Sequence, residues 1–324
     1  MSLTSAAKHS AISTTADNHV FFSLKEIFER HMRKTITAFL AAAVLVLLTA
    51  SCEWGRTKTG GQTDSLDAAA VQELTFIQVR YADSVQLKGE GSVILSLKAV
   101  WPDAKCQSVL ADSIRRWLAD LMSECALPQW NEDEGKITKF EGDITDGQAL
   151  VAHYGRQGMN AMMAEVREAE ADSFPVFGME NSLEVKVECN TDSFITLTYG
   201  YYVYTGGAHG GYLCGGASFN KADGRQLGWN VIDLSKKDQL IALIREGLKE
   251  YFEVKTDAEL DEQLQLYDDP DTPVDESASL PLPQTEPYLT DKGVVFIYQQ
   301  YEIACYAAGL PTCVIPFDKI PMRK

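Results

Sequence analysis

The strands of the chain are marked by two kinds of hydrophobic pattern. In residues 183–189, apolar side chains alternate with Glu and Lys, which is typical of a strand with one buried face. Other stretches are rich in β-branched and aromatic residues and are bounded by turn residues, which also predicts strands. These stretches are residues 74–87, 92–101, 194–204, 214–220, 225–229, 293–303 and 312–317. Asp223-Gly224, between two of them, predicts a hairpin turn.

Two further segments have the spacing of amphipathic helices. Residues 110–122 place six large apolar side chains on one face, and we assign Arg115 to the opposite, polar face. Burial of each apolar side chain is worth about 1.5–3 kcal/mol before entropy is subtracted, so this helix belongs to a core. A later helix is predicted to begin at Ser235, a good cap residue, and to continue to about residue 252.

A long helix is predicted between these two. It begins at Asp146, a good N-cap residue, and runs to about residue 172. Gly155 and Gly158 weaken it, which predicts a kink or a close packing partner at these positions. The order of strands and helices predicts an α+β fold, with a mainly antiparallel sheet, helices packed on one face and two associated subdomains.

The first 52 residues have the plan of an export signal. Met32-Arg33-Lys34 is a short basic start, and the apolar run after it is too short to span a bilayer permanently. Cys52 directly follows Ala50-Ser51 and resembles the lipobox cysteine of bacterial lipoproteins, which is lipidated and becomes the mature N-terminus. An ordinary secretory signal is the alternative. We expect translation to start at Met32, lipidation of Cys52, and a place in the bacterial cell envelope.

These features predict four segments along the chain. Residues 1–52 are upstream residues and a lipoprotein signal, and residues 53–73 are a polar, glycine-containing tether. Residues 74–145 form an N-terminal α+β subdomain, and residues 146–324 form a C-terminal α+β subdomain that contains a Gly-Gly-Ala-His motif.

The chain is strongly acidic, with a net charge of −17 over its 324 residues. Removal of residues 1–52 takes away five basic and three acidic residues and leaves a charge of −19. Such a surface repels nucleic acid and anionic membrane lipids and attracts cationic partners. Solubility alone is an equally good reason for the charge. We expect a monomer that binds no nucleic acid and contacts the membrane only through its lipid anchor.

No complete catalytic or metal-binding motif is present in the sequence. After Cys52 there are six cysteines, which permit disulfides, and two histidines, His153 and His209. Without a CxxC pair these residues do not predict zinc, and the acidic stretch at residues 256–287 lacks the glycine and spacing of a calcium loop. His209-Gly210-Gly211 is similar to the oxyanion motif of α/β-hydrolases, but the GxSxG nucleophile motif is absent. We predict no metal, no cofactor and no catalytic residue.

Three motifs in the second half of the chain carry a family resemblance. They are YTGGAH at residues 204–209, FIYQQYEIA at 296–304 and YAAG at 306–309. The chain resembles the sensor domain of lysozyme-responsive anti-sigma factors and the non-catalytic module found beside some peptidoglycan deacetylase domains. The match is firmest from residue 183 to the C-terminus, and residues 74–130 resemble the smaller domain that commonly precedes it. The deacetylase domain and the transmembrane signalling helix of those relatives have no counterpart here, so neither activity is implied.

The resemblance implies an envelope module that binds a lysozyme-like muramidase or a cell-wall glycan without catalysis. The alternative is an envelope hydrolase or esterase with an unrecognised site, for which His209 and Glu302 would be the first residues to test. A second open question is whether the motif residues form a buried hydrogen-bonded network or a recognition surface. The candidate ligand-binding residues are Tyr204, Gly206, Gly207, His209, Tyr301, Glu302 and Tyr306.

Overall fold

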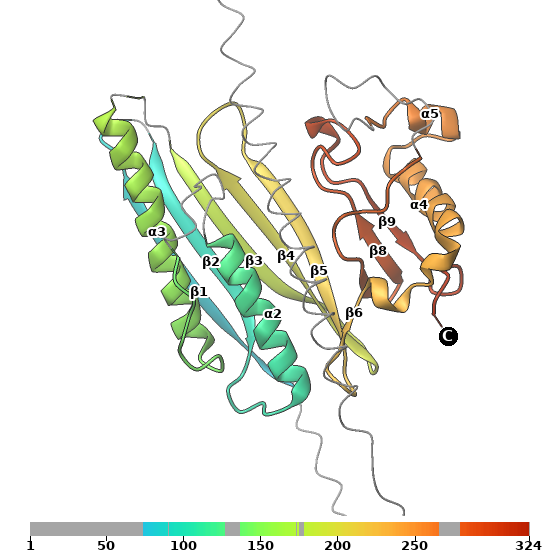
Figure 1. The fold of residues 1–324 in the computed structure, drawn as a ribbon, viewed down its shortest axis with the longest axis horizontal. Coiled ribbons are helices and arrows are strands. Elements are labelled where there is room, and N and C mark those ends of the chain that lie inside the picture. Colours follow the sequence, from blue (N-terminus) through green and yellow to red (C-terminus); the bar gives the residue numbers. More distant parts are fainter. Residues whose placement is uncertain are drawn as a thin grey trace, which may run out of the picture.

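The computed structural model describes residues 74–89, 91–126, 137–172, 174, 178–265 and 279–323. These residues form a six-stranded sheet in the order β1-β2-β3-β4-β5-β6 and a three-stranded sheet in the order β7-β8-β9 (Figure 1). The strands are β1 (Phe76–Gln86), β2 (Ser92–Pro102), β3 (Met179–Asn190), β4 (Phe194–Tyr204), β5 (Gly211–Asn220), β6 (Gln226–Leu227), β7 (Tyr288–Thr290), β8 (Gly293–Ile297) and β9 (Thr312–Ile315). The α-helices are α2 (Val109–Cys125), α3 (Gly147–Ala171), α4 (Lys237–Tyr251) and α5 (Asp257–Asp261). The predicted α+β class is confirmed.

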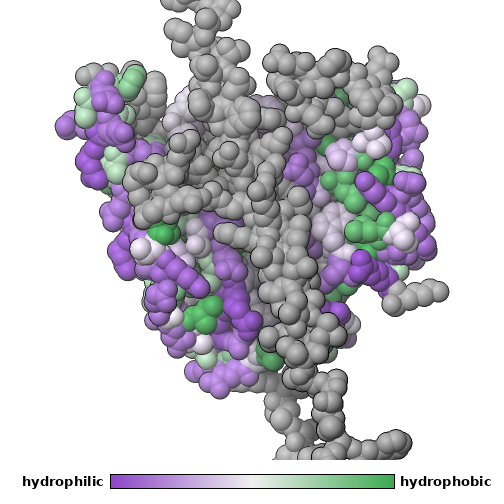
Figure 2. All heavy atoms as spheres, viewed as in Figure 1, coloured by the Kyte–Doolittle hydropathy of each residue, from purple (hydrophilic) through white to green (hydrophobic). Residues whose placement is uncertain are grey.

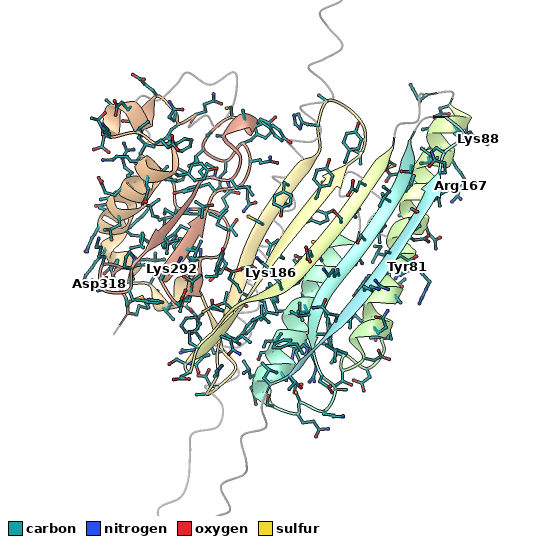
Figure 3. All side chains as sticks on the ribbon, turned by 180° about the vertical axis from the view of Figure 1, so that it is seen from behind. Tyr81, Lys88, Arg167, Lys186, Lys292 and Asp318 are labelled. Atoms are coloured by element: carbon teal, nitrogen blue, oxygen red, sulfur yellow. The ribbon has the colours of Figure 1, made fainter. Side chains whose placement is uncertain are left out.

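The two long helices lie together on one face of the six-stranded sheet. Strands β2 and β3 pair in parallel, and every other pair of neighbouring strands in the described sheets is antiparallel. A parallel pair needs a long crossover, and α2 and α3 lie within it (Figure 1). The outer surface of these helices is mostly hydrophilic (Figure 2). Seen from behind, the opposite face of the sheet is not covered by either helix (Figure 3).

The predicted features of α3 are confirmed. The side chain of Asp146 accepts a hydrogen bond from the backbone N–H of Ala149 and caps the helix. The ring of Tyr81 lies where a side chain on Gly155 would be, and the carbonyl oxygen of Ala126 lies where a side chain on Gly158 would be. The glycines therefore let α3 approach β1 and the end of α2 closely.

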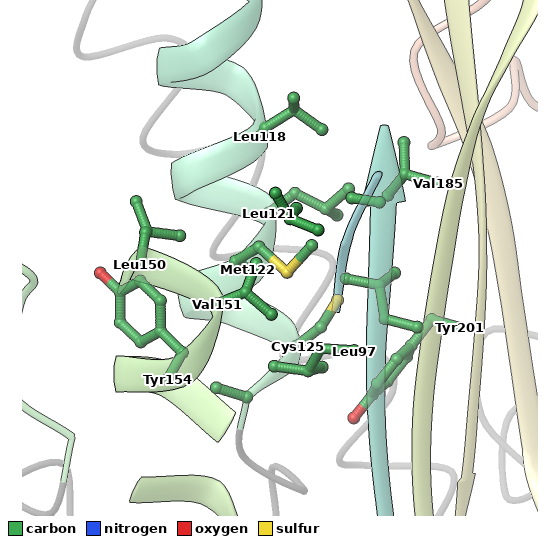
Figure 4. Packing of buried hydrophobic residues seen from close by; sticks show 14 of the residues in the cluster. Leu97, Leu118, Leu121, Met122, Cys125, Leu150, Val151, Tyr154, Val185 and Tyr201 are labelled. Carbon is green, nitrogen blue, oxygen red and sulfur yellow. The ribbon is translucent and has the colours of Figure 1, made fainter. Parts of the chain in front are cut away.

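The first hydrophobic core lies between these two helices and the sheet. Side chains from α2, α3 and the helix-facing side of the strands interdigitate there (Figure 4). Arg115 is also in this layer, because its side chain is only 1% exposed. Its guanidinium donates hydrogen bonds to the carbonyl oxygens of Asp103 and Cys106, at 2.7 and 2.9 Å. Its assignment to the polar face was wrong, because the carbonyls of the β2–α2 loop compensate for its burial.

The second core lies between α4 and the three-stranded sheet. Leu240, Ile244 and Leu248 of α4 pack against apolar residues of β7, β8 and β9. Ser235 does not cap this helix, because Asp233 caps a 3₁₀ turn before it and accepts a bond from the Ser235 hydroxyl. The predicted strand at residues 293–303 ends at Ile297, and a turn follows.

The described residues form two hydrophobic cores, and the second begins near residue 227. The cap at Asp146 begins a helix of the first core. The subdomain boundary between residues 145 and 146 stays a prediction. Buried polar contacts join the two parts: the hydroxyl of Thr196 donates to the carbonyl of Leu289 at 2.6 Å, and the backbone N–H of Leu289 donates to the Ser218 hydroxyl at 2.7 Å.

Several sequence predictions fall on residues outside those described. They are the signal, Cys52 and the tether, which lie before residue 74, and the middle of the acidic stretch, residues 266–278. In the described part of the chain, no helix is both long and apolar enough to cross a membrane. The six cysteines after Cys52 are all free thiols.

Candidate functional site

The uncovered face of the six-stranded sheet carries polar and aromatic side chains in register. Lys98 of β2, Glu184 of β3 and Gly200 of β4 are direct neighbours across the strands. In the next row, Ser96 lies beside Ser182, Ser182 beside Tyr202, and Tyr202 beside Tyr212 of β5. Because side chains alternate between the faces of a strand, these rows point away from the first core.

Two adjoining hollows open on this face, and we call them together the sheet groove. The larger hollow has a volume of about 390 Å³ and is lined by both sheets. Residues that line it include Glu184, Lys186, Thr198, Tyr212, Tyr288 and Ile297. The smaller hollow has a volume of about 250 Å³ and is lined by Ser96, Lys98, Ser182, Leu183, Glu184, Gly200, Tyr202 and Tyr212. The hollows share Glu184, Gly200 and Tyr212, so they adjoin at these residues.

Tyrosine side chains lie over glycines in and beside the groove. The Tyr212 hydroxyl lies where a side chain on Gly200 would be, and the Tyr288 ring occupies the same place at Gly216. At the end of the β4–β5 hairpin, the Tyr202 ring covers Gly210 in the same way. A residue with a Cβ at these positions would push the rings outward. The glycines therefore let the rings lie against the sheet and present an aromatic surface.

The groove also carries opposite charges and neutral hydroxyl groups. Lys98 Nζ lies 2.7 Å from Glu184 Oε1, and Lys186 Nζ lies 3.2 Å from Glu188 Oε2. Burial, followed by the charges of Cys214 and Glu184, raises the pKa of Tyr212 above its ordinary value. The phenol therefore stays protonated near neutral pH and can donate a hydrogen bond. The tyrosine rings of the groove can therefore contact an apolar face of a ligand, and its charged and hydroxyl groups can bind a polar edge.

Three of the predicted site residues come together beside the groove. His209 stacks on Tyr306, with ring centroids 3.8 Å apart, and its Nε2 lies 3.3 Å from the Tyr301 hydroxyl. Its Nδ1 lies 3.2 Å from the carbonyl oxygen of Gly210, which can only accept. Neutral His209 is therefore protonated on Nδ1 and accepts a hydrogen bond from Tyr301. Both ring nitrogens are occupied, and neither hollow of the groove is lined by His209 or Tyr301.

Tyr204, Gly206 and Gly207 shape the loop that precedes His209. The Tyr204 hydroxyl donates to the carbonyl of Gly207 at 3.2 Å. Gly206 and Gly207 have φ angles of 95° and 90°, which L side chains rarely adopt. These residues therefore fix the hairpin loop.

Glu302 is turned away from the His209 cluster. Its two carboxylate oxygens accept backbone N–H bonds from Gln284 and Gln299, both at 2.7 Å. Burial raises the pKa of Glu302 to about 7, although both backbone bonds act in the opposite direction. The candidate residues thus divide among a loop, an aromatic cluster and a half-buried carboxylate, and the described contacts do not join them into the single network that the sequence left open.

Gln299 and Gln300 form hydrogen bonds with backbone groups of β5 that have no neighbouring strand. The side-chain oxygen of Gln300 accepts the N–H of Tyr212 at 2.8 Å. The amide of Gln299 both accepts from and donates to the backbone of Cys214, at 3.1 and 2.8 Å. These amides replace the ladder bonds of a missing neighbouring strand and hold the second sheet against the groove. Among the described residues, no three His, Cys, Asp or Glu side chains lie close enough together to hold a metal ion.

The groove was not predicted from the sequence. Its signal was present as glycine–tyrosine alternation in two neighbouring segments, YGYY at residues 199–202 and GGY at 210–212. Sequence alone did not reveal which face of this strand pair is left uncovered.

Two protein-family models match the chain, one within each of its two cores. Residues 232–318 match the model of DUF3298, a family described as proteins of unknown function, and residues 119–212 match the model named deacetylase PdaC. The first match covers most of the second core, and the second runs from α2 to the start of β5. No curated protein matches the chain. The expected resemblance to a family of unknown function and to a module of a deacetylase is confirmed, whereas the link to anti-sigma factors stays a prediction.

Two crystal structures are similar to the chain. A DUF3298 family member from Bacteroides fragilis is 20% identical and has a TM-score of 0.57; the match covers 76% of this chain and 91% of that one. A DUF3298 family protein from Pseudomonas aeruginosa is 16% identical, with a TM-score of 0.50 and coverage of 77% and 95%. At these identities the similarity establishes the fold.

Proposed function

We propose that the protein is a non-catalytic binding module of the cell envelope and that its sheet groove holds a segment of a cell-wall glycan. The observation that carries this proposal is the groove in which Tyr212 and Tyr288 lie over glycines of the sheet. Sugar rings have an apolar face and a hydroxylated edge. The ring of a tyrosine can pack against the apolar face of a sugar, and its hydroxyl group can hydrogen-bond the hydroxylated edge.

The side chains that would serve a hydrolase are engaged elsewhere, which favours binding over catalysis. Both nitrogens of His209 have partners, and both oxygens of Glu302 accept backbone bonds. A general base must lie within hydrogen-bond reach of the proton that it abstracts, and neither His209 nor Glu302 lines either hollow of the groove.

The match to the deacetylase PdaC model supports a cell-wall ligand. Deacetylation itself is not part of the proposal, since the described residues bring no metal-ligating set together. We further propose that lipidation at Cys52 and the polar residues after it tether the groove within reach of the cell wall.

Calorimetric titration of the purified protein with the N-acetylglucosamine hexamer tests this function. Tyr212→Ala is expected to weaken binding about five- to hundredfold, with the 1–3 kcal/mol that a base stacked on an aromatic ring contributes taken as the scale for a sugar ring. Tyr251→Ala is the matched control: Tyr251 is 38% exposed, Tyr212 is 40% exposed, and Tyr251 lies at the end of α4 outside both hollows. The control is expected to bind as the wild type does.

Two results would overturn the proposal. Absence of hexamer binding at low salt, or equal weakening by both tyrosine substitutions, would remove the groove as a glycan site. Salt-sensitive binding of a basic muramidase without any sugar binding would instead assign the role to the acidic surface of the chain. Turnover of muropeptides that is lost in His209→Ala or Glu302→Ala would contradict the non-catalytic assignment.

A further inference from the structure

The smaller hollow of the groove differs in chemistry from the larger one. Two hydroxyl side chains, Ser96 and Ser182, are direct neighbours across the β2–β3 pair. Lys98 and Glu184 lie two residues further along the same strands, on the same face, and their charged atoms are 2.7 Å apart. Its aromatic lining consists of Tyr202 and Tyr212. This hollow therefore has a polar floor and an ion pair, whereas the larger hollow includes Tyr288 and Ile297.

The ion pair in the smaller hollow is open to solvent. The side chains of Lys98 and Glu184 are 53% and 62% exposed. An exposed pair of this kind contributes little to stability, so its two charges can exchange partners at little cost. A ligand carboxylate can pair with the Lys98 ammonium while a ligand ammonium pairs with the Glu184 carboxylate.

The charge balance of the groove contrasts with that of the whole chain. The chain has 46 acidic and 29 basic residues, but the charged residues that line the two hollows are two lysines and two glutamates. A site for a cationic protein would be lined by acidic groups. Alternating opposite charges complement a ligand that carries both signs.

We infer that the smaller hollow is a subsite for a zwitterionic amino-acid or short-peptide substituent on the glycan, while the larger hollow takes the sugar rings. The two hollows adjoin at Glu184, Gly200 and Tyr212, which places the two subsites next to each other along one ligand. The inference rests on the proposed function and specifies its ligand as a peptide-bearing sugar chain. The hydroxyls of Ser96 and Ser182 are placed to hydrogen-bond the amide groups of such a substituent.

Three probes separate the contributions of sugar and peptide. They are a disaccharide-tetrapeptide released from peptidoglycan, the same disaccharide without its peptide, and the uncharged N-acetylglucosamine hexamer. The peptide is expected to tighten binding to the wild type by about two- to fivefold, since two exposed charge pairs form and the Lys98–Glu184 pair is lost. Lys98→Gln is expected to remove this gain and to leave hexamer binding within about twofold.

Lys186→Gln provides a matched control for this variant. Lys186 is also paired with a glutamate and is 67% exposed, but it lines only the larger hollow. It is expected to retain the gain from the peptide. Equal binding of the two disaccharides to the wild type, or loss of the gain in both lysine variants, would overturn the subsite while leaving hexamer binding, and so the proposed function, intact. Failure of all three probes would overturn the proposed function itself.

Discussion

Replacement of Glu302 by glutamine is expected to change how the stability of the fold depends on pH. Burial raises the pKa of Glu302 from its ordinary value of 4.5 to about 7. Between these values the unfolded chain has released the proton and the folded chain still holds it, so stability falls as the pH rises through this window. The pKa difference corresponds to about 3 kcal/mol, lost by the wild type between about pH 4.5 and 7.

The glutamine of Glu302→Gln is uncharged in both the folded and the unfolded chain. The stability of this variant therefore does not change through this residue between about pH 4.5 and 7. Its single acceptor oxygen can serve only one of the N–H groups of Gln284 and Gln299, which costs about 1–3 kcal/mol at acidic pH. Near pH 8 the wild type has lost its advantage, and the two proteins should be similarly stable. Urea unfolding near pH 5 and near pH 8 measures both differences.

Glu259→Gln is the matched control for the sign of the effect. Backbone bonds from Lys255 and Thr256 lower the pKa of Glu259, so its contribution is present above the unfolded pKa and is lost only as the pH falls below it. The stability difference between this variant and the wild type should therefore not change between about pH 5 and pH 8. If Glu302→Gln also shows the same difference from the wild type at both pH values, the assignment of a raised pKa to buried Glu302 is refuted.

Four further substitutions test the packing of the groove, the hairpin beside it and the first core by urea unfolding and hexamer titration. Gly200→Ala should leave stability within about 1 kcal/mol and weaken hexamer binding about as much as Tyr212→Ala does, because the far end of the Tyr212 side chain must move. Gly158→Ala, whose added Cβ meets a backbone carbonyl, should cost about 1–3 kcal/mol and keep binding. His209→Ala should cost about 1–2 kcal/mol through the lost ring stack and hydrogen bond, with hexamer binding unchanged. Arg115→Leu should cost about 3 kcal/mol or more, because buried carbonyls lose their donors.

Each of these substitutions has an outcome that counts against its reasoning. Retained hexamer binding in Gly200→Ala would show that the position of Tyr212 does not matter, and full stability in Gly158→Ala would show that α3 is not closely packed there. Loss of hexamer binding in His209→Ala would place that residue in the site. An Arg115→Leu variant as stable as the wild type would mean that the loop carbonyls find other donors.

Local signals in the sequence predicted the elements of this fold well. The helical spacing near residue 110 and the cap at Asp146 correspond to α2 and α3, and the two glycines of α3 mark real close contacts. Such features depend on residues a few positions apart. Arg115 was misjudged because its burial depends on contacts with the carbonyls of the loop between β2 and α2.

The groove depends on long-range pairing that no local pattern specifies. Its lining runs from Ser96 to Ile297, and it exists because β2 pairs in parallel with β3 and because the second sheet docks beside β5. Alternation along β4 shows which residues share a face, but not that α2 and α3 cover the opposite face. The motif at residues 204–209 did identify the hairpin that borders the groove, and its histidine and glycines position that hairpin.

The most direct measurement of ligand in the groove is the methyl NMR spectrum of isoleucine-labelled protein during titration with the N-acetylglucosamine hexamer. Ile297 lines the larger hollow, whereas Ile244 of α4 is buried in the second core away from it. We predict a saturable shift of the Ile297 signal, no shift at Ile244, and a shift of Ile297 in Tyr212→Ala that requires at least about five times more hexamer. An Ile297 signal that does not move at saturating hexamer, or that titrates at the same hexamer concentrations in the Tyr212→Ala variant, would contradict binding of the glycan in the sheet groove.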